Sequence, residues 1–158
     1  MKKAALHNLG CKVNAYETEA MQEILEKHGY EIVPFGEKAD VYLINTCSVT
    51  NIADRKSRQM LHRARKMNPD AVVIAAGCYV QAAGRELLQD SSVDILIGNN
   101  EKANLPEILK AWEEEHDASH IHDLTREHTY EELSLSHTAE HTRAYMKIQD
   151  GCNQFCTY

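Results

Sequence analysis

The chain has 158 residues, of which 43% are hydrophobic and 26% are charged, with only seven Gly and three Pro. This balance excludes a disordered, collagen-like or membrane-spanning chain, and the length suits one domain with a real core. The net charge of −7 does not suggest a nucleic-acid binder. The start, MKKAALHNLG, has too short an apolar run for a signal peptide, so we expect a cytoplasmic protein with no membrane partner.

Residues 1–112 alternate between apolar runs of strand length and helical patterns. Several of the runs lack polar alternation, which is typical of parallel strands buried on both faces. We expect strands at Ala4–Leu9, Tyr30–Val33, Val41–Ile44, Val72–Ala76 and Ile95–Ile97. The alternation predicts an α/β fold with an open, doubly wound parallel sheet.

The helical patterns lie between these runs. Asn14 and Glu17 resemble a capping box at the start of the first helix, and Gly29 is placed to end it. The apolar face of this helix is expected to consist of Met21, Ile24, Leu25 and His28. Further helices are predicted at Ala53–Asn68, Gln81–Leu88 and Asn104–Trp112.

Residues 113–143 are polar, lack apolar periodicity and hold six of the nine histidines. We expect a loosely ordered linker, with at most a short helix around Thr129–Leu133. The pairs His120-x-His122 and His137–His141 have a spacing that could bind a metal ion, but solvated linker histidines are the commoner explanation. Ala144–Gln149 then predicts the first strand of a second domain, which would begin at residue 144.

Three of the five cysteines each follow an expected strand. Cys11 stands in NLGCKVN, Cys47 in LINTCSVTN and Cys78 in AAGCYVQ. In an open parallel sheet, the loops after the strands lie at the carboxyl edge, where such folds bind ligands. We therefore expect the topology to bring the three thiols together. The odd cysteine count and a reducing compartment argue against a disulfide framework.

Two kinds of metal centre suit three thiolates. One is catalytic zinc with an open fourth position, and the other is an iron–sulfur cluster with one iron left for an exogenous ligand. No Asp or Glu stands immediately beside the three cysteines to act as a hydrolytic base, which favours iron–sulfur over a zinc hydrolase. A non-catalytic metal- or flavin-binding α/β module is a further alternative, which explains the sheet but not the cysteine placement.

The chain ends on CNQFCTY, in which three residues separate Cys152 from Cys156. One more cysteine after Tyr158 would give the spacing C-x3-C-x2-C. That is the cluster motif of radical S-adenosylmethionine enzymes, in which three thiolates hold a [4Fe–4S] cluster and the fourth iron binds the cofactor. We therefore expect the motif to be cut one residue short, with the preceding strand belonging to a barrel.

With these motifs, the whole chain resembles the radical S-adenosylmethionine methylthiotransferases, which insert a methylthio group into tRNA or a ribosomal protein. The resemblance implies that residues 1–112 are the family's amino-terminal α/β domain and residues 144–158 the start of its radical core. The chain would then be an inactive fragment without the barrel. LGCKVNAYETEA, NTCSVTNIADRKSRQ and KIQDGCNQFCTY are most similar to the branch acting on N6-threonylcarbamoyladenosine beside the anticodon. The isopentenyladenosine and ribosomal-protein branches are the alternatives.

The resemblance also implies cofactors and partners. Cys11, Cys47 and Cys78 would hold an auxiliary [4Fe–4S] cluster, and Cys152 and Cys156 the cluster that cleaves S-adenosylmethionine, with Tyr158 at that cofactor. One S-adenosylmethionine would methylate sulfur at the auxiliary cluster, and reductive cleavage of another would give a radical that activates C2 of the adenine. The implied partners are a tRNA anticodon stem-loop and an electron donor protein.

The expected helix at Ala53–Asn68 has a basic half. The candidate RNA-binding residues on it are Arg55, Lys56, Arg58, Arg63 and Lys66, with His62 and Arg65 beside them. The other half consists of Ala53, Ser57, Met60, Leu61, Ala64 and Met67. No acidic residue lies between Arg55 and Lys66, which suggests contact with phosphates. The alternative is a merely solvated face, in keeping with the net charge of −7.

Overall fold

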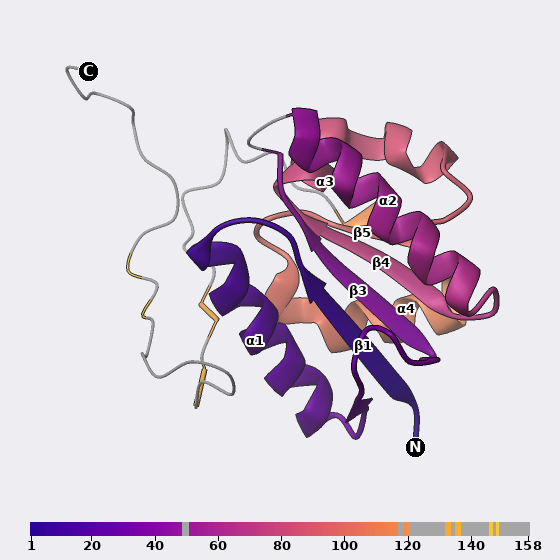
Figure 1. Cartoon of the computed structure of the whole chain (residues 1–158). Helices are drawn as coiled ribbons and strands as arrows, with labels where there is room; N and C mark the ends of the chain where they lie inside the picture. Colours follow the sequence, from indigo (N-terminus) through magenta and orange to yellow (C-terminus); the bar gives the residue numbers. More distant parts are fainter. Residues whose placement is uncertain are drawn as a thin grey trace.

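The computed structural model describes residues 1–48, 51–116, 119–120, 132–133, 135–136, 146 and 148. These residues form a six-stranded sheet in the order β2-β1-β3-β4-β5-β6, with every neighbouring pair parallel and with helices on both faces (Figure 1). The strands are β1 (Lys3–Asn8), β2 (Glu31–Ile32), β3 (Val41–Thr46), β4 (Val72–Gly77), β5 (Ile95–Ile97) and β6 (Ser119–His120). The predicted α/β, doubly wound parallel sheet is confirmed.

The central strands form where the sequence has uninterrupted apolar runs. All six residues of β3 are buried, because helices cover both faces of the sheet at that position. The helices are α1 (Lys12–Lys27), α2 (Asn51–Met67), α3 (Cys78–Ala83) and α4 (Leu105–Glu115), with the 3-10 turns η1 (Gly84–Gln89) and η2 (Lys102–Asn104). Among these helices, none is both long and apolar enough to cross a membrane.

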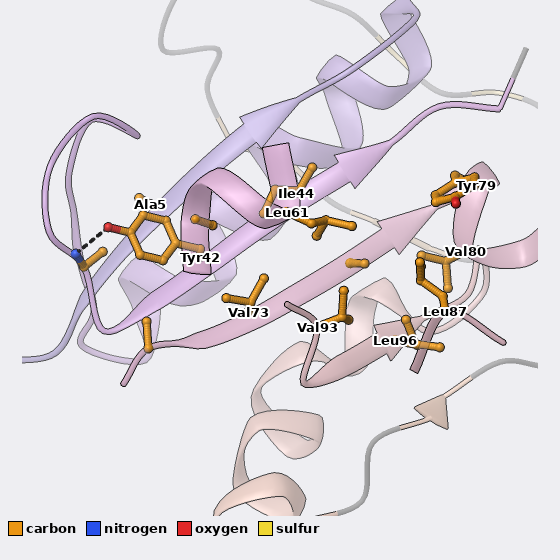
Figure 2. Packing of buried hydrophobic residues seen from close by; sticks show 14 of the residues in the cluster. Ala5, Tyr42, Ile44, Leu61, Val73, Tyr79, Val80, Leu87, Val93 and Leu96 are labelled. Atoms are coloured by element: carbon orange, nitrogen blue, oxygen red, sulfur yellow. Dashed lines mark hydrogen bonds between the residues drawn. The ribbon is translucent and has the colours of Figure 1, made fainter. Parts of the chain in front are cut away.

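Two hydrophobic clusters fill the space on the two faces of the sheet. In the cluster of Figure 2, Leu61 of α2 and Val80 of α3 pack with sheet residues such as Ile44 and Val73. The second cluster places Met21 and Leu25 of α1 and Leu105, Ile108 and Leu109 of α4 against the other face. Burial of these side chains at about 25 cal/mol per Å² of apolar area is the main force that holds the layers together.

Tyr42 closes the turn between β2 and β3 from inside the core. Its hydroxyl donates to the carbonyl of Glu37 (2.6 Å) and accepts from the amide of Ala39 (3.0 Å), the latter shown by the dashed line in Figure 2. The side-chain NH₂ of Asn68 donates to the Ala39 carbonyl (2.7 Å). These bonds satisfy the buried backbone groups of the connection, which contains no helix.

The predicted capping box at Asn14 and Glu17 is wrong. Helix α1 begins at Lys12 with Cys11 as its N-cap, so both residues lie inside the helix and are buried. The Asn14 amide instead satisfies carbonyls at the ends of two strands, and Glu17 forms an ion pair with Lys102. Gly29, with φ of +83°, follows the helix end as predicted.

Two further details of the predicted helices differ in the structure. His28 is exposed at the C-cap of α1, so the apolar face consists of Met21, Ile24 and Leu25 without it. The third helix begins at Cys78, and it changes to a 3-10 turn at Gly84, where φ is +61°. A positive φ interrupts regular α-helix, which explains the break inside the predicted range Gln81–Leu88.

Parts of the segment 113–143 carry structure that its composition does not indicate. Helix α4 runs to Glu115, and β6 pairs with β5 through Leu96 and Ile97. Strand pairing satisfies backbone groups whatever the side chains are, so a polar dipeptide can extend the sheet. The predicted helix around Thr129–Leu133 and strand Ala144–Gln149 lie almost wholly outside the described residues, within which Met146 and Ile148 are exposed. The boundaries at 112 and 143 stay predictions.

Glu23 of α1 connects the described residues of 132–136 to the domain. Its carboxylate accepts hydrogen bonds from the backbone amide (2.8 Å) and the hydroxyl of Ser136 and pairs with Lys27 (2.7 Å). Nearby, the Tyr16 hydroxyl donates to the carbonyl of Leu133 (2.6 Å), whose side chain is buried. The hydrogen bonds from Lys27 and then Ser136 lower the pKa of Glu23 from 4.5 to about 2.

This lowered pKa predicts a pH-dependent contribution to stability. The contribution is fully present above pH 4.5 and is lost as the pH falls through about 2, because the folded chain holds the carboxylate ionised. Urea unfolding should therefore show wild type more stable than Glu23→Gln near neutral pH, with the difference vanishing near pH 2. Glu26→Gln, at an exposed position of the same helix, is the control. A Glu23→Gln effect that did not change with pH would contradict this explanation.

Candidate metal centre

Cys11, Cys47 and Cys78 lie at the carboxyl ends of three neighbouring strands. Cys11 caps α1 just beyond β1, Cys47 directly follows β3, and Cys78 directly follows β4 as the first residue of α3. Strands β1, β3 and β4 are adjacent and parallel, so the three residues share one edge of the sheet. Cys11 is exposed, Cys78 is partly buried and Cys47 is buried.

Asn14 holds together the loops that carry Cys11 and Cys47. Its Nδ2 donates to the carbonyl of Leu9 (3.0 Å), two residues before Cys11, and to the carbonyl of Thr46 (2.9 Å), directly before Cys47. Its Oδ1 lies 3.9 Å from the Cys11 sulfur, within hydrogen-bonding range for a thiol. One side chain from the first turn of α1 thus fixes two of the three cysteine positions.

Two glycines allow the loops to approach closely. A Cβ at Gly10 would lie 2.8 Å from Cβ and 3.0 Å from Sγ of Cys47, so only glycine leaves the space beside this thiol open. A Cβ at Gly77 would lie 2.5 Å from Oδ1 of Asn45 and 2.6 Å from the Thr46 carbonyl. Gly77 also has φ of +98°, which side-chain-bearing residues rarely adopt.

The thiol of Cys78 lies in a mixed environment. Burial raises its pKa, which is the largest effect, while the charge of Lys102 and a hydrogen bond from Asn99 oppose it. Glu17 and Cys47 also act on this thiol, and both raise its pKa. The effect of Cys47 on the Cys78 thiol indicates that Cys47 lies in electrostatic range of it.

The three thiols are a donor set that suits an iron–sulfur cluster. Within the described part of the chain, no three His, Cys, Asp or Glu side chains converge closely enough to hold one metal ion. A cluster distributes its thiolates over several irons, and iron in such clusters takes thiolate ligands. The all-sulfur donors and the space kept beside Cys47 by Gly10 fit such a group. The ligand roles of the three cysteines stay predictions.

Sequence reasoning missed three residues of this site. The local pattern predicts Asn14 as a helix cap, although a buried Asn within a helix must find partners elsewhere. Lys102 and Asn99 carried no sequence signal, because their roles depend on residues remote in the chain. Cys152, Cys156 and Tyr158, predicted to bind the second cluster and its cofactor, lie outside the described residues.

The basic side of α2 forms a separate feature. Arg55, Lys56, Arg58, Arg63 and Lys66 are exposed, and their contact with RNA stays a prediction. The opposite side packs on the sheet, with Ser57, Leu61 and Ala64 buried. A hollow of about 610 Å³ opens beside the helix and is lined by Leu9, Lys56, Gln59, Met60, His62, Arg63 and Lys66. Burial and the nearby Arg63 lower the pKa of His7.

Other elements neutralise part of this basic side. Arg65 pairs with Asp94 and donates to the carbonyls of Pro69 (2.7 Å) and Ala71 (2.8 Å), so it is a structural residue. His62 lies 2.8 Å from the Asp90 carboxylate. Arg58 donates to the Tyr79 hydroxyl (3.0 Å) while remaining exposed. The prediction of a face without acidic partners therefore holds along the helix sequence but not in three dimensions.

A protein-family model described as "Uncharacterized protein family UPF0004" matches residues 3–98, which include all three cysteines of the sheet edge. The chain belongs to the UPF0004 family.

Relatives of this UPF0004 chain carry the names of methylthiotransferases. It is 42% identical to the threonylcarbamoyladenosine tRNA methylthiotransferase MtaB of Bacillus subtilis, over 100% of this chain and 35% of that protein. It is 38% identical to the MtaB of Aquifex aeolicus, over 99% of this chain and 38% of that protein. A tRNA-2-methylthio-N(6)-dimethylallyladenosine synthase of Rickettsia conorii is 32% identical, over 99% of this chain and 37% of that protein. The chain thus spans little more than a third of these relatives, and the resemblance to methylthiotransferases is confirmed.

Solved structures support the fold. The radical S-adenosylmethionine methyltransferase TsrM of Kitasatospora setae matches with a TM-score of 0.56 at 14% identity, over 72% of this chain and 26% of that one. A CheY-like receiver domain of Methanospirillum hungatei matches with a TM-score of 0.55 at 17% identity, over 74% of this chain and 97% of that one. At such identities the likeness shows that the UPF0004 chain has a doubly wound fold shared by proteins of different functions.

The close approach at Gly77 predicts a site-specific loss of stability. Gly77→Ala should lower the free energy of unfolding by more than Gly84→Ala does, by at least ~1 kcal/mol, because only the first adds a Cβ against backbone. The two glycines are matched, with φ/ψ of 98°/−159° and 61°/−152°, and a Cβ at Gly84 meets nothing within 4 Å. Denaturant unfolding of both variants measures the difference. Equal losses would show that backbone strain alone makes glycine necessary at Gly77.

Proposed function

We propose that this chain is the amino-terminal part of a tRNA methylthiotransferase that adds a methylthio group to C2 of N6-threonylcarbamoyladenosine beside the anticodon. The observation that carries the proposal is the placement of Cys11, Cys47 and Cys78 at one edge of the sheet. Similarity to MtaB proteins over the full chain supports the substrate branch, at 42% and 38% identity against 32% for the dimethylallyladenosine synthase. The dimethylallyladenosine branch is therefore the alternative.

Each group of residues has its own part in this proposal. Cys11, Cys47 and Cys78 would hold an auxiliary [4Fe–4S] cluster, and Cys152 and Cys156 would contribute to a second one, with Tyr158 at S-adenosylmethionine. Bound there, the auxiliary cluster would carry the sulfur that is transferred, and the second cluster would pass on the electron for reductive cleavage of the cofactor. Asn14 and Gly10 position the first two thiolates, and the burial of Cys47 limits access of water to its sulfur. An electron donor protein and a cytoplasmic location belong to the same proposal.

We assign the tRNA contact within this chain to the exposed basic side of α2. Lys56, Arg63 and Lys66 line one hollow, and each can pair with a phosphate oxygen. Leu9, two residues before Cys11, lines the same hollow, so RNA bound there would lie next to the loop of a proposed cluster ligand. Arg55 and Arg58 extend the basic surface along the helix. The net charge of −7 does not oppose this, because steering depends on local potential.

Cysteine substitutions in the full-length enzyme test the division between the two clusters. Cys47→Ala should abolish methylthiolated tRNA while leaving some deoxyadenosine formation, because the S-adenosylmethionine cluster keeps its ligands. Cys152→Ala should abolish both products. Iron content should fall by about half in either variant, if each cluster holds four irons. Mass spectrometry of tRNA nucleosides and chromatographic assay of deoxyadenosine give the readouts. Wild-type methylthiolation by Cys47→Ala would show that the amino-terminal cysteines are only structural.

Neutralisation of the hollow tests the tRNA contact. Arg63→Gln with Lys66→Gln should weaken binding of a tRNA anticodon stem-loop and reduce the slope of log K against log salt by about one per lost phosphate contact. Binding titrations at several salt concentrations give the slope. Lys110→Gln is the matched control, because Lys110 is exposed on α4, on the opposite face of the sheet. An unchanged slope in the double variant, or an equal change in Lys110→Gln, would exclude this surface.

A further inference from the structure

A buried ion pair lies at the same edge of the sheet as the three cysteines. The ammonium of Lys102, in η2, is 2.5 Å from the carboxylate of Glu17 in α1, and the two side chains are 1% and 5% exposed. Removing both charges from water is unfavourable, and a well-packed apolar pair would often be as stable. A purely structural role therefore explains the position of this pair poorly.

Asn99 connects the ion pair to Cys78. Lys102 Nζ donates to Asn99 Oδ1 (3.4 Å), and the side chain of Asn99 hydrogen-bonds to the Cys78 thiol. Because Oδ1 accepts from the ammonium, the NH₂ group of the amide is the part left to donate to sulfur. The backbone amide of Asn99 donates to Gln81 Oε1 (3.2 Å), which holds this loop against α3. A continuous series of contacts thus runs from Glu17 through Lys102 and Asn99 to Cys78.

We propose that Glu17, Lys102 and Asn99 set the reduction potential of the cluster held by Cys11, Cys47 and Cys78. The ammonium of Lys102 has the main effect, through its charge and through the orientation of Asn99. The inference rests on the proposed function, since it needs a cluster at this edge. One-electron reduction by an external reductant adds one negative charge at the site. A buried ammonium nearby stabilises the reduced form, and a buried carboxylate destabilises it. Hydrogen bonds to cluster sulfurs act in the same direction as the ammonium.

An electrostatic role and a structural role of the ion pair predict different signs for the shifts in reduction potential. Lys102→Met and Glu17→Gln both break the ion pair with little change of side-chain shape, so a structural role predicts similar defects. The electrostatic role predicts that Lys102→Met shifts the potential to more negative values and Glu17→Gln to more positive values. Combining the two substitutions should bring the potential back toward wild type, and Lys102→Arg, which keeps the charge, should stay near it.

The experiment uses the 158-residue chain carrying Cys152→Ser and Cys156→Ser, so that only the amino-terminal cysteines can assemble a cluster. After anaerobic reconstitution with iron and sulfide, iron content is measured, and the potential is read from a redox titration followed by electron paramagnetic resonance. Asn99→Leu is included as a variant outside the ion pair. It should shift the potential to more negative values, because it removes a hydrogen bond to the Cys78 sulfur.

Opposite shifts for Lys102→Met and Glu17→Gln, with a negative shift for Asn99→Leu, would support the proposal. Iron uptake with unmoved potentials, or with shifts of one sign in both ion-pair variants, would overturn it and leave the proposed function intact. If Lys102→Met fails to fold, Glu17→Gln and Asn99→Leu still decide by the signs of their shifts. Absence of iron uptake by the parent chain would overturn the proposed function and this inference together.

Discussion

The amide of Asn14 is the interaction on which the carboxyl edge of the sheet depends. The side-chain NH₂ of Asn14 donates to the carbonyls of Leu9 and Thr46, and the backbone carbonyl of Asn14 accepts from the side chain of Asn45 (3.0 Å). These bonds tie the first turn of α1 to the ends of β1 and β3. Leaving either buried carbonyl unsatisfied would cost about 1–3 kcal/mol, and the loops of Cys11 and Cys47 would lose their common support. The helix start, the strand ends and the cysteine positions therefore form one unit.

Much of this fold could be predicted, because its strands are uninterrupted apolar runs. Ile95–Ile97 and the run from Val41 form strands where the sequence indicates them, since both faces of the sheet are covered. The start of α1 was mispredicted because Asn14 and Thr46 are 32 positions apart, and a local pattern cannot show such a partner. Strand β6 escaped prediction because backbone pairing, which needs no apolar side chain, creates it.

The candidate site likewise has features that the sequence predicts and features that depend on residues remote in the chain. Cysteines that each come just after a strand indicate a common edge, because parallel topology alone places them there. Lys102 reads as an ordinary surface lysine, and only its pairing with Glu17, 85 positions away, explains its burial. On α2 the periodicity correctly separates a buried side from a basic one. The periodicity also groups Arg65 with the basic residues. It cannot show that Arg65 pairs with Asp94, because Asp94 lies in another part of the chain.

The cysteine edge and the basic hollow share the same short segments of chain. Leu9 lines the hollow, its backbone amide donates to the Asn45 carbonyl (2.9 Å), and its carbonyl accepts from the Asn14 side chain. From the buried side of α2, the Ser57 hydroxyl donates to the carbonyl of Cys47 (3.4 Å). A phosphate held by Lys56 and Arg63 would therefore contact α2 and lie beside Leu9. Helix α2 also holds the backbone of Cys47, and Leu9 belongs to the loop that carries Cys11. The proposed phosphate contact and the proposed cluster ligands would therefore be connected through α2 and the end of β1.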